Sequence, residues 1–435
     1  MILTALVLLI WFNNSVNVLS YKVDVVDFGI YHQALLELSQ FEYLNPYITV
    51  RDVLIFNDHF DPVILLIAPL TRFFNYSPVF SYFIEISFVL GTMFMMTKDK
   101  WPYKNELFLS LLLLVFSRGV VSGLYYGIHP TTWSMLPMYF VFKSMKLENT
   151  FLILVSFFAL FLFKEIFPII GLSTGLAYLV LKKWKIGFAL SSLSLFFLCM
   201  IFIVRPSMSV GTIDYSQLDY LKNSYHFPWK DFLKMLIPVI IPGYFILKEN
   251  RRNLFLYIAF YLPLLGMHIV SGKGYYHYGV VIAFPLILWV HFYLKETSFW
   301  HNRKRVGISF LIVFLIGLGS HQKSFKKIFS HNYEFPVTSV DVHACQGTIL
   351  STPGLITRLL RPGVKFYELN SFSKHLRQYD CLLLPNNLTT LAFRYDVSLL
   401  KKGCVDTNTK VIHKDQTLTF YRGPFKQKCL ESLIQ

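Results

Sequence analysis

Apolar runs of membrane-spanning length follow one another from residue 2 to residue 318 of the 435-residue chain. An α-helix needs about 20 apolar residues to cross the hydrocarbon core of a bilayer. Some of the runs are shorter, as tilted or half-spanning helices are. The pattern predicts a polytopic α-helical membrane protein with about eleven transmembrane helices. The predicted spans are Ile2–Leu19, Pro78–Thr97, Glu106–Ser122, Thr132–Met145, Thr150–Phe163, Phe167–Leu181, Ile186–Val204, Phe232–Leu247, Leu254–Val270, Tyr278–Leu294 and Val306–Leu318.

The composition fits this class and excludes an ordinary soluble enzyme. The chain is 54% hydrophobic and only 15% charged, which is far from the balance of a soluble globular domain. The formal net charge is +16, but Lys and Arg gather in short clusters between the apolar runs and in the C-terminal tail. That distribution is typical of topology signals and of contact with membrane lipids, so we expect no nucleic-acid partner.

Alternate connections between the apolar runs carry the basic clusters, near residues 98–104, 143–146, 182–185, 248–252 and 295–305. Cytoplasmic connections hold the excess of Lys and Arg in membrane proteins. The alternation therefore predicts the N-terminus inside, and the loop 21–77 and the C-terminal tail outside. The segment Met1–Trp11 has no basic start and no small-residue cleavage site, so we expect a first span and not a cleaved signal peptide.

The first loop, residues 21–77, is polar and long, and ordered loops of this length are usually functional. A helix from Asp27 to Phe41 with apolar residues on one side is expected to lie on the membrane surface. A second helix is predicted to begin with Asp61 as N-cap and Pro62 at the first helical position. The acidic and histidine side chains of the loop are Asp24, Asp27, Asp52, Asp58, His59 and Asp61.

The tail, residues 322–435, has a different pattern. Short strands are predicted near residues 337–342, 364–367 and 381–384, with a capped helix that starts at Thr352 and Pro353. We therefore expect a transmembrane domain over residues 1–321 and a small extracytoplasmic α/β domain over residues 322–435. Its even number of cysteines suggests two disulfides, or else free buried thiols. Among Cys345, Cys381, Cys404 and Cys429, the local pair Cys404 with Cys429 is favoured.

Several ionisable or polar residues at the ends of the predicted spans fall on the same side of the membrane as the first loop. Such residues are costly at this depth unless they pair or line a cavity. Interfacial snorkelling or helix capping explains any single one of them, so the case for a site rests on the set. Glu85 and Arg118, inside two adjacent spans, could form an ion pair. The outward-facing set is His129, Lys164, Glu165, Arg205, Lys273, His277 and Tyr278.

The spacing Asp58-His59-x-Asp61 matches a metal-ligand cluster in composition only. A capped helix start explains Asp61 equally well. We therefore assign no metal ligands and no certain cofactor, and a divalent metal stays open. The chain has no phosphate-binding glycine loop of the Walker type and no nucleophile elbow.

Short motifs in a fixed order resemble the domain-of-unknown-function family 2079, a family of predicted bacterial and archaeal membrane proteins. The match covers most of the chain. The chain departs from the family pattern at His32, at Ile166 and by lacking a proline soon after Tyr278, which puts a second carboxylate role in doubt. The motifs are Val26–Gln33, Asn57–Pro62 with the apolar run to Leu70, His129-Pro130, Lys164-Glu165, Tyr276–Tyr278, Ser339-Val340 and Tyr379–Leu383.

That family in turn resembles membrane glycosyltransferases of the GT-C type. The resemblance implies an essential acid in the first extracytoplasmic loop and a polyprenyl-phosphate sugar lipid as donor. It makes Asp27 the expected general base. In the mechanism that we expect, His59 and His129 orient the sugar or assist this base. The residues expected to bind substrate are Asp58, His129, Lys164, Glu165, Arg205, Lys273, His277 and Tyr278.

The function that follows is transfer of a hexosyl or pentosyl group from the polyprenyl-phosphate donor to an unknown acceptor, at the outer face of a bacterial or archaeal cytoplasmic membrane. Two alternatives stay open. A transporter or lipid flippase would use the same polar residues without covalent chemistry. A non-catalytic membrane tether would use the C-terminal domain as its binding module.

Overall fold

The structure is a computed structural model of the chain and divides into two compact units. The first comprises residues 1–11, 56–63 and 84–331, and the second comprises residues 12–55, 64–83 and 332–435. This division differs from the predicted domains 1–321 and 322–435, because most of the first loop groups with the tail. The described residues are 2–19, 26–50, 53–99, 104–205, 229–249, 254–271, 277–294, 297–330, 340–351, 353–362, 364–368, 380–385, 409–414 and 418–423, and at some element ends, Asp27 and His277 among them, only the backbone is described.

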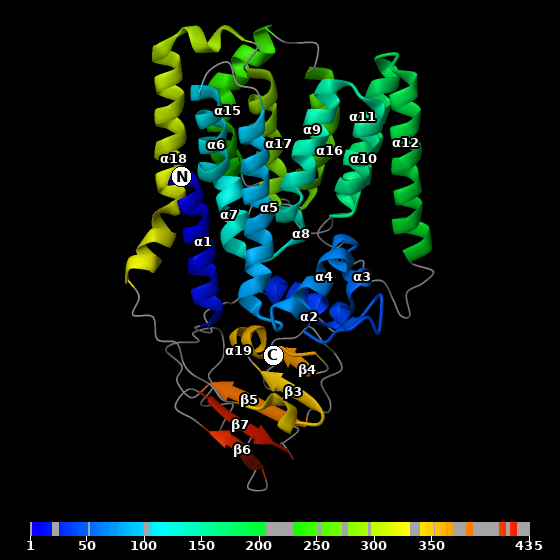
Figure 1. Cartoon of the computed structure of the whole chain (residues 1–435), viewed down its shortest axis with the longest axis vertical. Coiled ribbons are helices and arrows are strands. Elements are labelled where there is room, and N and C mark those ends of the chain that lie inside the picture. The colour runs from blue at the N-terminus through cyan, green and yellow to red at the C-terminus, as the bar shows by residue number, and fades with distance from the viewer. Residues whose placement is uncertain are drawn as a thin grey trace. The chain divides into compact units, whose positions relative to one another are not determined.

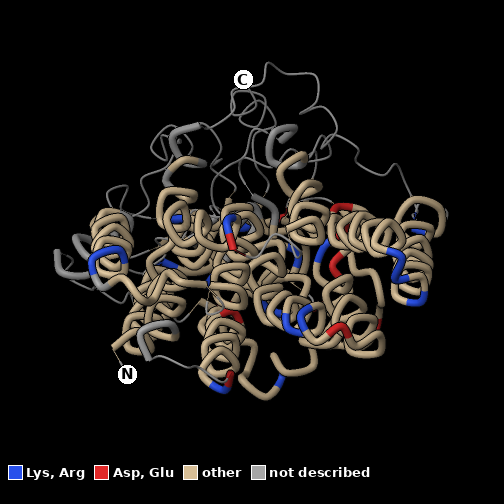
Figure 2. The backbone as a smooth tube through the Cα atoms, turned by 90° about the horizontal axis from the view of Figure 1, so that it is seen from above, with Lys and Arg blue, Asp and Glu red and all other residues tan. Residues whose placement is uncertain are grey.

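The first unit is helical, and Figure 1 shows its helices lying side by side. Among its closest pairs are α11 with α12, α7 with α17 and α9 with α10. Seen from above in Figure 2, charged residues occupy few turns of these helices. The elements are α1 (Ile2–Leu19), α3 (Ile55–Asp58), α5 (Pro78–Lys98), α6 (Lys104–Phe116), α7 (Arg118–Tyr126), α8 (Pro130–Trp133), α9 (Met135–Leu147), α10 (Thr150–Phe161), α11 (Ile166–Val180), α12 (Trp184–Cys199), η1 (Met200–Val204), α15 (Trp229–Glu249), α16 (Leu254–Ser271), α17 (His277–Tyr293), η4 (Ser298–His301) and α18 (Arg303–Ser330).

Three described helices are long and apolar enough to cross a membrane, at Ile2–Leu19, Pro78–Lys98 and Trp184–Val204. A fourth span results if Leu107–Phe116 and Arg118–Tyr125, which bend by 50° at their junction, count as one. Several other apolar helices near the predicted positions, such as Thr150–Phe161, are shorter. The count of eleven therefore stays a prediction, and the structure describes up to four spans.

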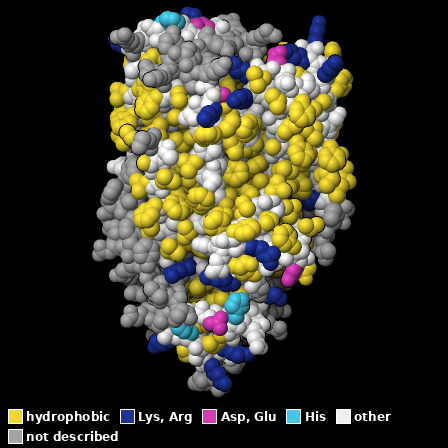
Figure 3. Space-filling model, in the orientation of Figure 1, with side chains coloured by type: hydrophobic (Ala, Val, Ile, Leu, Met, Phe, Trp, Pro, Cys, Tyr) yellow, Lys and Arg dark blue, Asp and Glu magenta, His cyan; other side chains and the backbone are white. Residues whose placement is uncertain are grey.

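Large apolar side chains project outward from the bundle of the first unit. On α10 and α12, Phe151, Phe158, Phe188 and Phe196 are exposed. Figure 3 shows hydrophobic side chains covering most of the face that these helices and their neighbours turn to the viewer. A contiguous apolar surface of this kind marks contact with lipid or with another protein. It is consistent with a membrane protein.

Glycines let α7 and α17 approach closely. A Cβ atom on Gly119 would lie 2.4 Å from the carbonyl oxygen of Gly279, and one on Gly123 would lie 2.2 Å from Cγ2 of Val280. Gly119 and Gly123 are four residues apart and so share one face of α7. Small residues at this spacing are typical of tightly packed membrane helices. The sequence-based interpretation did not use this motif.

We expect Gly119→Ala to destabilise the protein by about 1–3 kcal/mol, the usual cost of overpacking. The added methyl group would meet backbone and the Cβ of Ala283 at 2.6 Å, and neither can rotate away. Gly266→Ala is the matched control, because nothing lies within 4 Å of a Cβ at that helical position. Thermal unfolding of both variants in detergent measures the difference, and equal melting temperatures would contradict the close packing.

The first-loop helix α2 (Val26–Ser39) belongs to the second unit. It was predicted to have one apolar side, and this is wrong; its position at the membrane surface stays a prediction. Phe28, Tyr31, Gln33 and Leu36 are all buried, although they point to different sides of the helix. A helix that is buried all round is an inner element, because it needs packing partners on every side. Its neighbours include β1 (Tyr47–Ile48), which pairs with β2 (Val53–Leu54), and a helix of the tail.

The second predicted loop helix is α4 (Val63–Phe73). It begins at Val63, one residue later than the prediction, which placed Pro62 at the first helical position. Pro69 lies inside the helix, near its end.

The tail contains the predicted small α/β domain. Its five-stranded sheet has the order β4-β3-β5-β7-β6. Strands β4, β3 and β5 are parallel, whereas β5, β7 and β6 pair antiparallel. The predicted strands at 364–367 and 381–384 are confirmed, but Val342 lies in a 3-10 turn and residues 337–339 lie outside the described residues. The elements are η5 (Val342–Ala344), β3 (Thr348–Ser351), α19 (Pro353–Leu359), β4 (Lys365–Glu368), β5 (Cys381–Pro385), β6 (Lys410–Lys414) and β7 (Leu418–Arg422).

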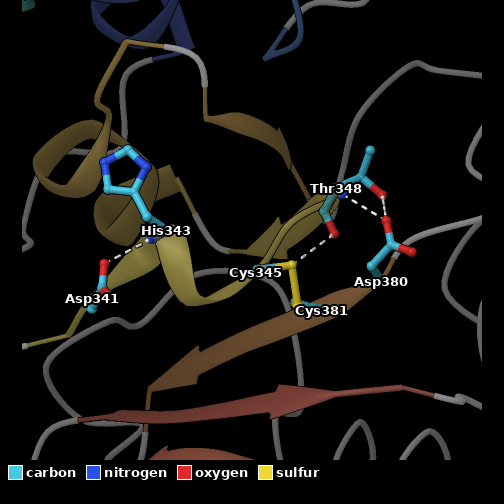
Figure 4. The surroundings of a disulfide bond; sticks show 6 residues. All are labelled: Asp341, His343, Cys345, Thr348, Asp380 and Cys381. Atoms are coloured by element: carbon cyan, nitrogen blue, oxygen red, sulfur yellow. Dashed lines mark hydrogen bonds between the residues drawn. A yellow bond between two sulfur atoms is a disulfide. The ribbon is translucent and has the colours of Figure 1, made fainter.

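A disulfide joins Cys345 to Cys381 and so ties the segment before β3 to the first residue of β5 (Figure 4). Beside it, the carboxylate of Asp380 accepts hydrogen bonds from the backbone N–H of Thr348 at 2.7 Å and from its hydroxyl at 3.2 Å. The favoured pairing of the other two tail cysteines, Cys404 and Cys429, falls outside the described residues. If Cys404 pairs with Cys429, Cys345 and Cys381 are left to pair with each other, and this is the disulfide that the structure shows.

Candidate functional site

Two connections of the first unit meet and carry five of the predicted site residues. The connection between α3 and α4 supplies Asp58, His59 and Asp61, and the connection between α10 and α11 supplies Lys164 and Glu165. The two connections are also joined through the backbone, because the N–H of Val63, the first residue of α4, donates a 2.9 Å hydrogen bond to the carbonyl oxygen of Leu162. Residues about 100 positions apart in the chain are thereby placed in one cluster.

Lys164 is the centre of this cluster. Its Nζ lies 3.0 Å from Nδ1 of His59, 3.8 Å from Oδ2 of Asp61 and 3.7 Å from Oε1 of Glu165. Only 4% of the residue is exposed, and Asp61 is fully buried. A buried ammonium group is retained only when carboxylates or hydrogen-bond acceptors surround it, since its desolvation costs several kcal/mol. The carboxylates of Asp61 and Glu165 meet that need.

The contact with Lys164 also determines the tautomer of His59. An ammonium group can only donate, so Nδ1 of His59 must accept. The ring hydrogen of the neutral imidazole is therefore on Nε2, which lies 3.7 Å from Oδ2 of Asp58. Asp58 is buried, whereas the side chain of His59 is 11% exposed. The imidazole thus lies between an acid and a cation and keeps an accessible edge, which is an arrangement suited to proton transfer.

The charges in this cluster shift one another's titration. Burial lowers the pKa of Lys164, but the charges of Asp61 and Glu165 outweigh it, so its pKa is raised. Burial raises the pKa of Glu165, but the positive charge of Lys164 outweighs it, so its pKa is lowered. Both groups are therefore ionised at neutral pH, in keeping with a mutually stabilised ion cluster.

Arg205 joins the cluster from the end of α12, where the helix continues as the π-helical turn η1. Single π-helical turns occur frequently at functional sites. The Nη2 of Arg205 donates a hydrogen bond to the carbonyl oxygen of Asn57, next to Asp58 in the chain. Its charge acts on Glu165. The second predicted cation is thus placed next to the first-loop motif.

His129 reaches the cluster from the start of α8. Its ring and that of His59 are 6.1 Å apart between centroids, edge to face. The backbone N–H of Thr131 donates to Nδ1 of His129 at 3.1 Å, so this histidine also caps the helix. The backbone N–H of His129 donates to Oε2 of Glu85 at 3.3 Å. Glu85 therefore does not form the expected ion pair with Arg118, because α8 brings the backbone of His129 to its carboxylate.

Three buried polar atoms around this cluster have no hydrogen-bond partner among the described residues. They are Nε of Arg205, Oε2 of Glu165 and Oε1 of Glu85. A buried polar group without a partner costs about 1–3 kcal/mol, so native proteins keep few of them and those few need an explanation. The three atoms comprise a guanidinium N–H donor and two carboxyl oxygens. A guanidinium donor suits an anionic group, and carboxyl oxygens suit hydroxyl groups.

The other predicted site residues are described only in part. Tyr278 is half-buried in the first turn of α17, and its charge, when ionised, would act on Lys164. Lys273 lies outside the described residues, as does the side chain of His277. The side chain of Asp27 is likewise outside them, although its backbone forms the second residue of α2.

A second polar cluster in the first unit was missed by the sequence-based interpretation. Asp99 follows α5, and its carboxylate accepts hydrogen bonds from Tyr139 at 2.6 Å, Lys143 at 2.8 Å and His291 at 3.0 Å. Burial raises the pKa of Asp99, but these hydrogen bonds outweigh it, so its pKa is lowered. Both carboxylate oxygens of Asp99 accept hydrogen bonds within the protein, so this cluster links the end of α5 to α9 and α17.

Among the described side chains, no group of three or more His, Cys, Asp or Glu is placed to hold a metal ion. Comparisons with models of protein families, with functionally characterised proteins and with solved structures find no match to this chain.

Proposed function

We propose that this protein is an integral membrane glycosyltransferase that moves a sugar from a polyprenyl-phosphate donor to an acceptor hydroxyl at the outer face of the membrane. The observation that carries the proposal is the cluster around Lys164, with buried open atoms on Arg205 and Glu165. A cation with an open N–H suits a phosphate group, and a carboxylate with an open oxygen suits a sugar hydroxyl. A sugar phosphate presents both.

The chemistry requires a base, a cation and a positioned donor. The acceptor oxygen forms a bond to the anomeric carbon, the bond from that carbon to the phosphate oxygen breaks, and the acceptor proton passes to a base. Lys164 and Arg205 would stabilise the negative charge that develops on the leaving phosphate. His59, held between Asp58 and Lys164, would orient the sugar or assist the base. The resemblance to the glycosyltransferases assigns the base to Asp27.

The two polar clusters support a transferase over a transporter. A transporter of this type needs polar groups that open to both faces of the membrane in turn. The cluster at Lys164 has open buried atoms, whereas the carboxylate of Asp99 in the other cluster is fully engaged by its own neighbours. That asymmetry favours a single binding site on one side. The alternating basic connections of the sequence support an outer position for the Lys164 cluster.

Mass spectrometry of the lipids that co-purify with the protein tests the proposal. We expect the wild-type protein to be enriched in a polyprenyl-phosphate sugar and Arg205→Gln to lose at least about tenfold of it, the usual consequence of removing a charged hydrogen-bond donor from a bound anion. Arg305→Gln is the matched control, because Arg305 contacts the ring of Phe245 and not the Lys164 cluster. If all three proteins carry only ordinary phospholipids, the donor hypothesis is wrong.

A further inference from the structure

The tail helix α19 is buried on two adjoining strips of its surface. Leu355 and Leu359 form one strip and Ile356 and Leu360 the other, and all four side chains are buried. Residues four apart lie above one another on a helix, so the two strips can contact two different partners. Within the second unit, α19 packs against β4 of its own sheet and against α2 of the first loop. It therefore links the tail to the loop.

The helix α2 is held on its other sides as well. Nδ1 of His32 lies 3.0 Å from the hydroxyl of Ser81, and the amide of Gln33 donates to the hydroxyl of Thr49 at 2.8 Å. Burial, together with the charge of Arg361 in the tail, lowers the pKa of His32 to about 3. The imidazole is therefore neutral at physiological pH. The burial of α2 requires the tail, since an apolar helix face that lost α19 would face water.

Arg358 of α19 adds a polar link. Its Nη1 donates a hydrogen bond to the carbonyl oxygen of Leu19, the last residue of α1. Carbonyl groups at a helix C-terminus lack partners within the helix, and cationic side chains are favourable there. The helix α19 thus contacts both helices that flank residues 20–25, namely the end of α1 and the body of α2. Asp27 is the second residue of α2.

We propose that the C-terminal domain is a positioning element for α2, in which α19 holds α2, and with it the proposed base Asp27, in place, and Arg358 fastens α19 to the end of α1. Arg358 is a positioning residue and need not touch substrate. The catalytic part of this inference rests on the proposed function, whereas the mechanical part, that α19 immobilises α2, does not. The tail is then neither an independent binding module nor dispensable for transfer.

Hydrogen–deuterium exchange of the full-length protein in detergent tests the mechanical part. In Arg358→Ala we expect the amides of residues 28–38 in α2 to exchange about tenfold faster, because local opening becomes easier when a charged hydrogen bond is lost. The amides of β5 and β7 should keep their protection, which shows that the sheet still folds. Arg422→Ala is the matched control, since Arg422 is an exposed residue of β7. Arg358→Lys, which keeps a cationic donor, should restore most of the protection.

The outcomes separate the two hypotheses. Faster exchange of α2 together with slower consumption of the donor lipid supports both the positioning role and the transferase. Faster exchange of α2 in a protein whose wild type consumes no donor supports the positioning of α2 and overturns the proposed function. Unchanged exchange of α2 with an intact sheet overturns the positioning role, as does equal exchange in Arg358→Lys and Arg358→Ala.

Discussion

Lys164→Met is expected to cost about 3–5 kcal/mol of stability, because removing one partner of a buried ion cluster leaves the others without compensation. Lys164 is 4% exposed and lies within 4 Å of the carboxylates of Asp61 and Glu165. Methionine keeps a flexible apolar stem but not the charge, so the loss of stability measures the contribution of the ammonium group. The same variant should lose the donor lipid, because it removes one of the two cations assigned to the phosphate.

Lys143→Met is the matched control for this prediction. Lys143 also pairs with a carboxylate, that of Asp99 at 2.8 Å, but its side chain is 34% exposed. A partly exposed ion pair contributes less than a fully buried one, so the control should lose less stability than Lys164→Met. Chemical or thermal unfolding of the purified proteins compares them. Equal losses in the two variants would contradict the central role of Lys164.

The pH dependence of the two proteins sharpens the test. The pKa of Glu165 is lowered in the wild type, so its stabilising effect is complete above its ordinary pKa of about 4.3 and is lost as the pH falls through the lowered value. The pKa of Lys164 is raised, so its effect is complete below about 10.4 and is lost as the pH rises through the raised value. The wild-type cluster therefore contributes fully between about pH 5 and 10.

In Lys164→Met, the effect of pH on the stability contributed by the buried carboxylate of Glu165 has the opposite sign. Without the ammonium group, the charge that most lowers the pKa of Glu165 is gone and burial raises this pKa, so protonation relieves the uncompensated charge of the buried carboxylate. The variant should consequently recover stability relative to the wild type as the pH falls from 8 to about 5. Melting temperatures measured across this range test it. A constant difference between variant and wild type would show that charge is not the cause of the loss.

The convergence of site residues could be anticipated from the sequence. Burying an ionisable side chain at membrane depth costs free energy unless the side chain pairs with another group or lines a cavity. Asp58, His59, Lys164, Glu165 and Arg205 come from three separate connections, and each is costly there alone. Pairing them removes the cost. That reasoning identifies the members of the set, but it cannot say that Lys164 is at the centre or that His59 carries its hydrogen on Nε2, since both depend on distances between connections.

Other features escaped prediction for physical reasons. The helix α2 was assigned one apolar side because its partners, β1 and α19, are short or far away in the sequence. The glycine motif at Gly119 and Gly123 produces no hydrophobic periodicity, and its meaning depends on Gly279, about 160 positions later. Asp99 and Lys143 lie in the basic connections 98–104 and 143–146, whose charges are explained by membrane topology alone. In each case, tertiary contacts decided what local pattern left open.

Asp27→Asn is expected to reduce transfer by about 10²–10⁴-fold, the usual contribution of a general base. The amide has nearly the shape of the carboxylate but cannot take the acceptor proton. Asn suits a helix start as well as Asp, so α2 should still form and the donor lipid should still bind. The donor is therefore expected to accumulate on the variant, where mass spectrometry can detect it. Asp24→Asn, three residues earlier, is the matched control and should keep its activity.

The result also decides between two bases. Asp27 is assigned through a family resemblance, whereas the pair Asp58 and His59 is defined by the structure, with Nε2 of His59 3.7 Å from the carboxylate. If Asp27→Asn stays active while His59→Asn and Asp58→Asn both lose transfer, the base is the imidazole and Asp58 orients it. Proton uptake at Nδ1 would then require Lys164 to leave that nitrogen, so transfer should depend on the donor phosphate drawing Lys164 away. Loss in Asp27→Asn alone would instead leave His59 as a binding residue.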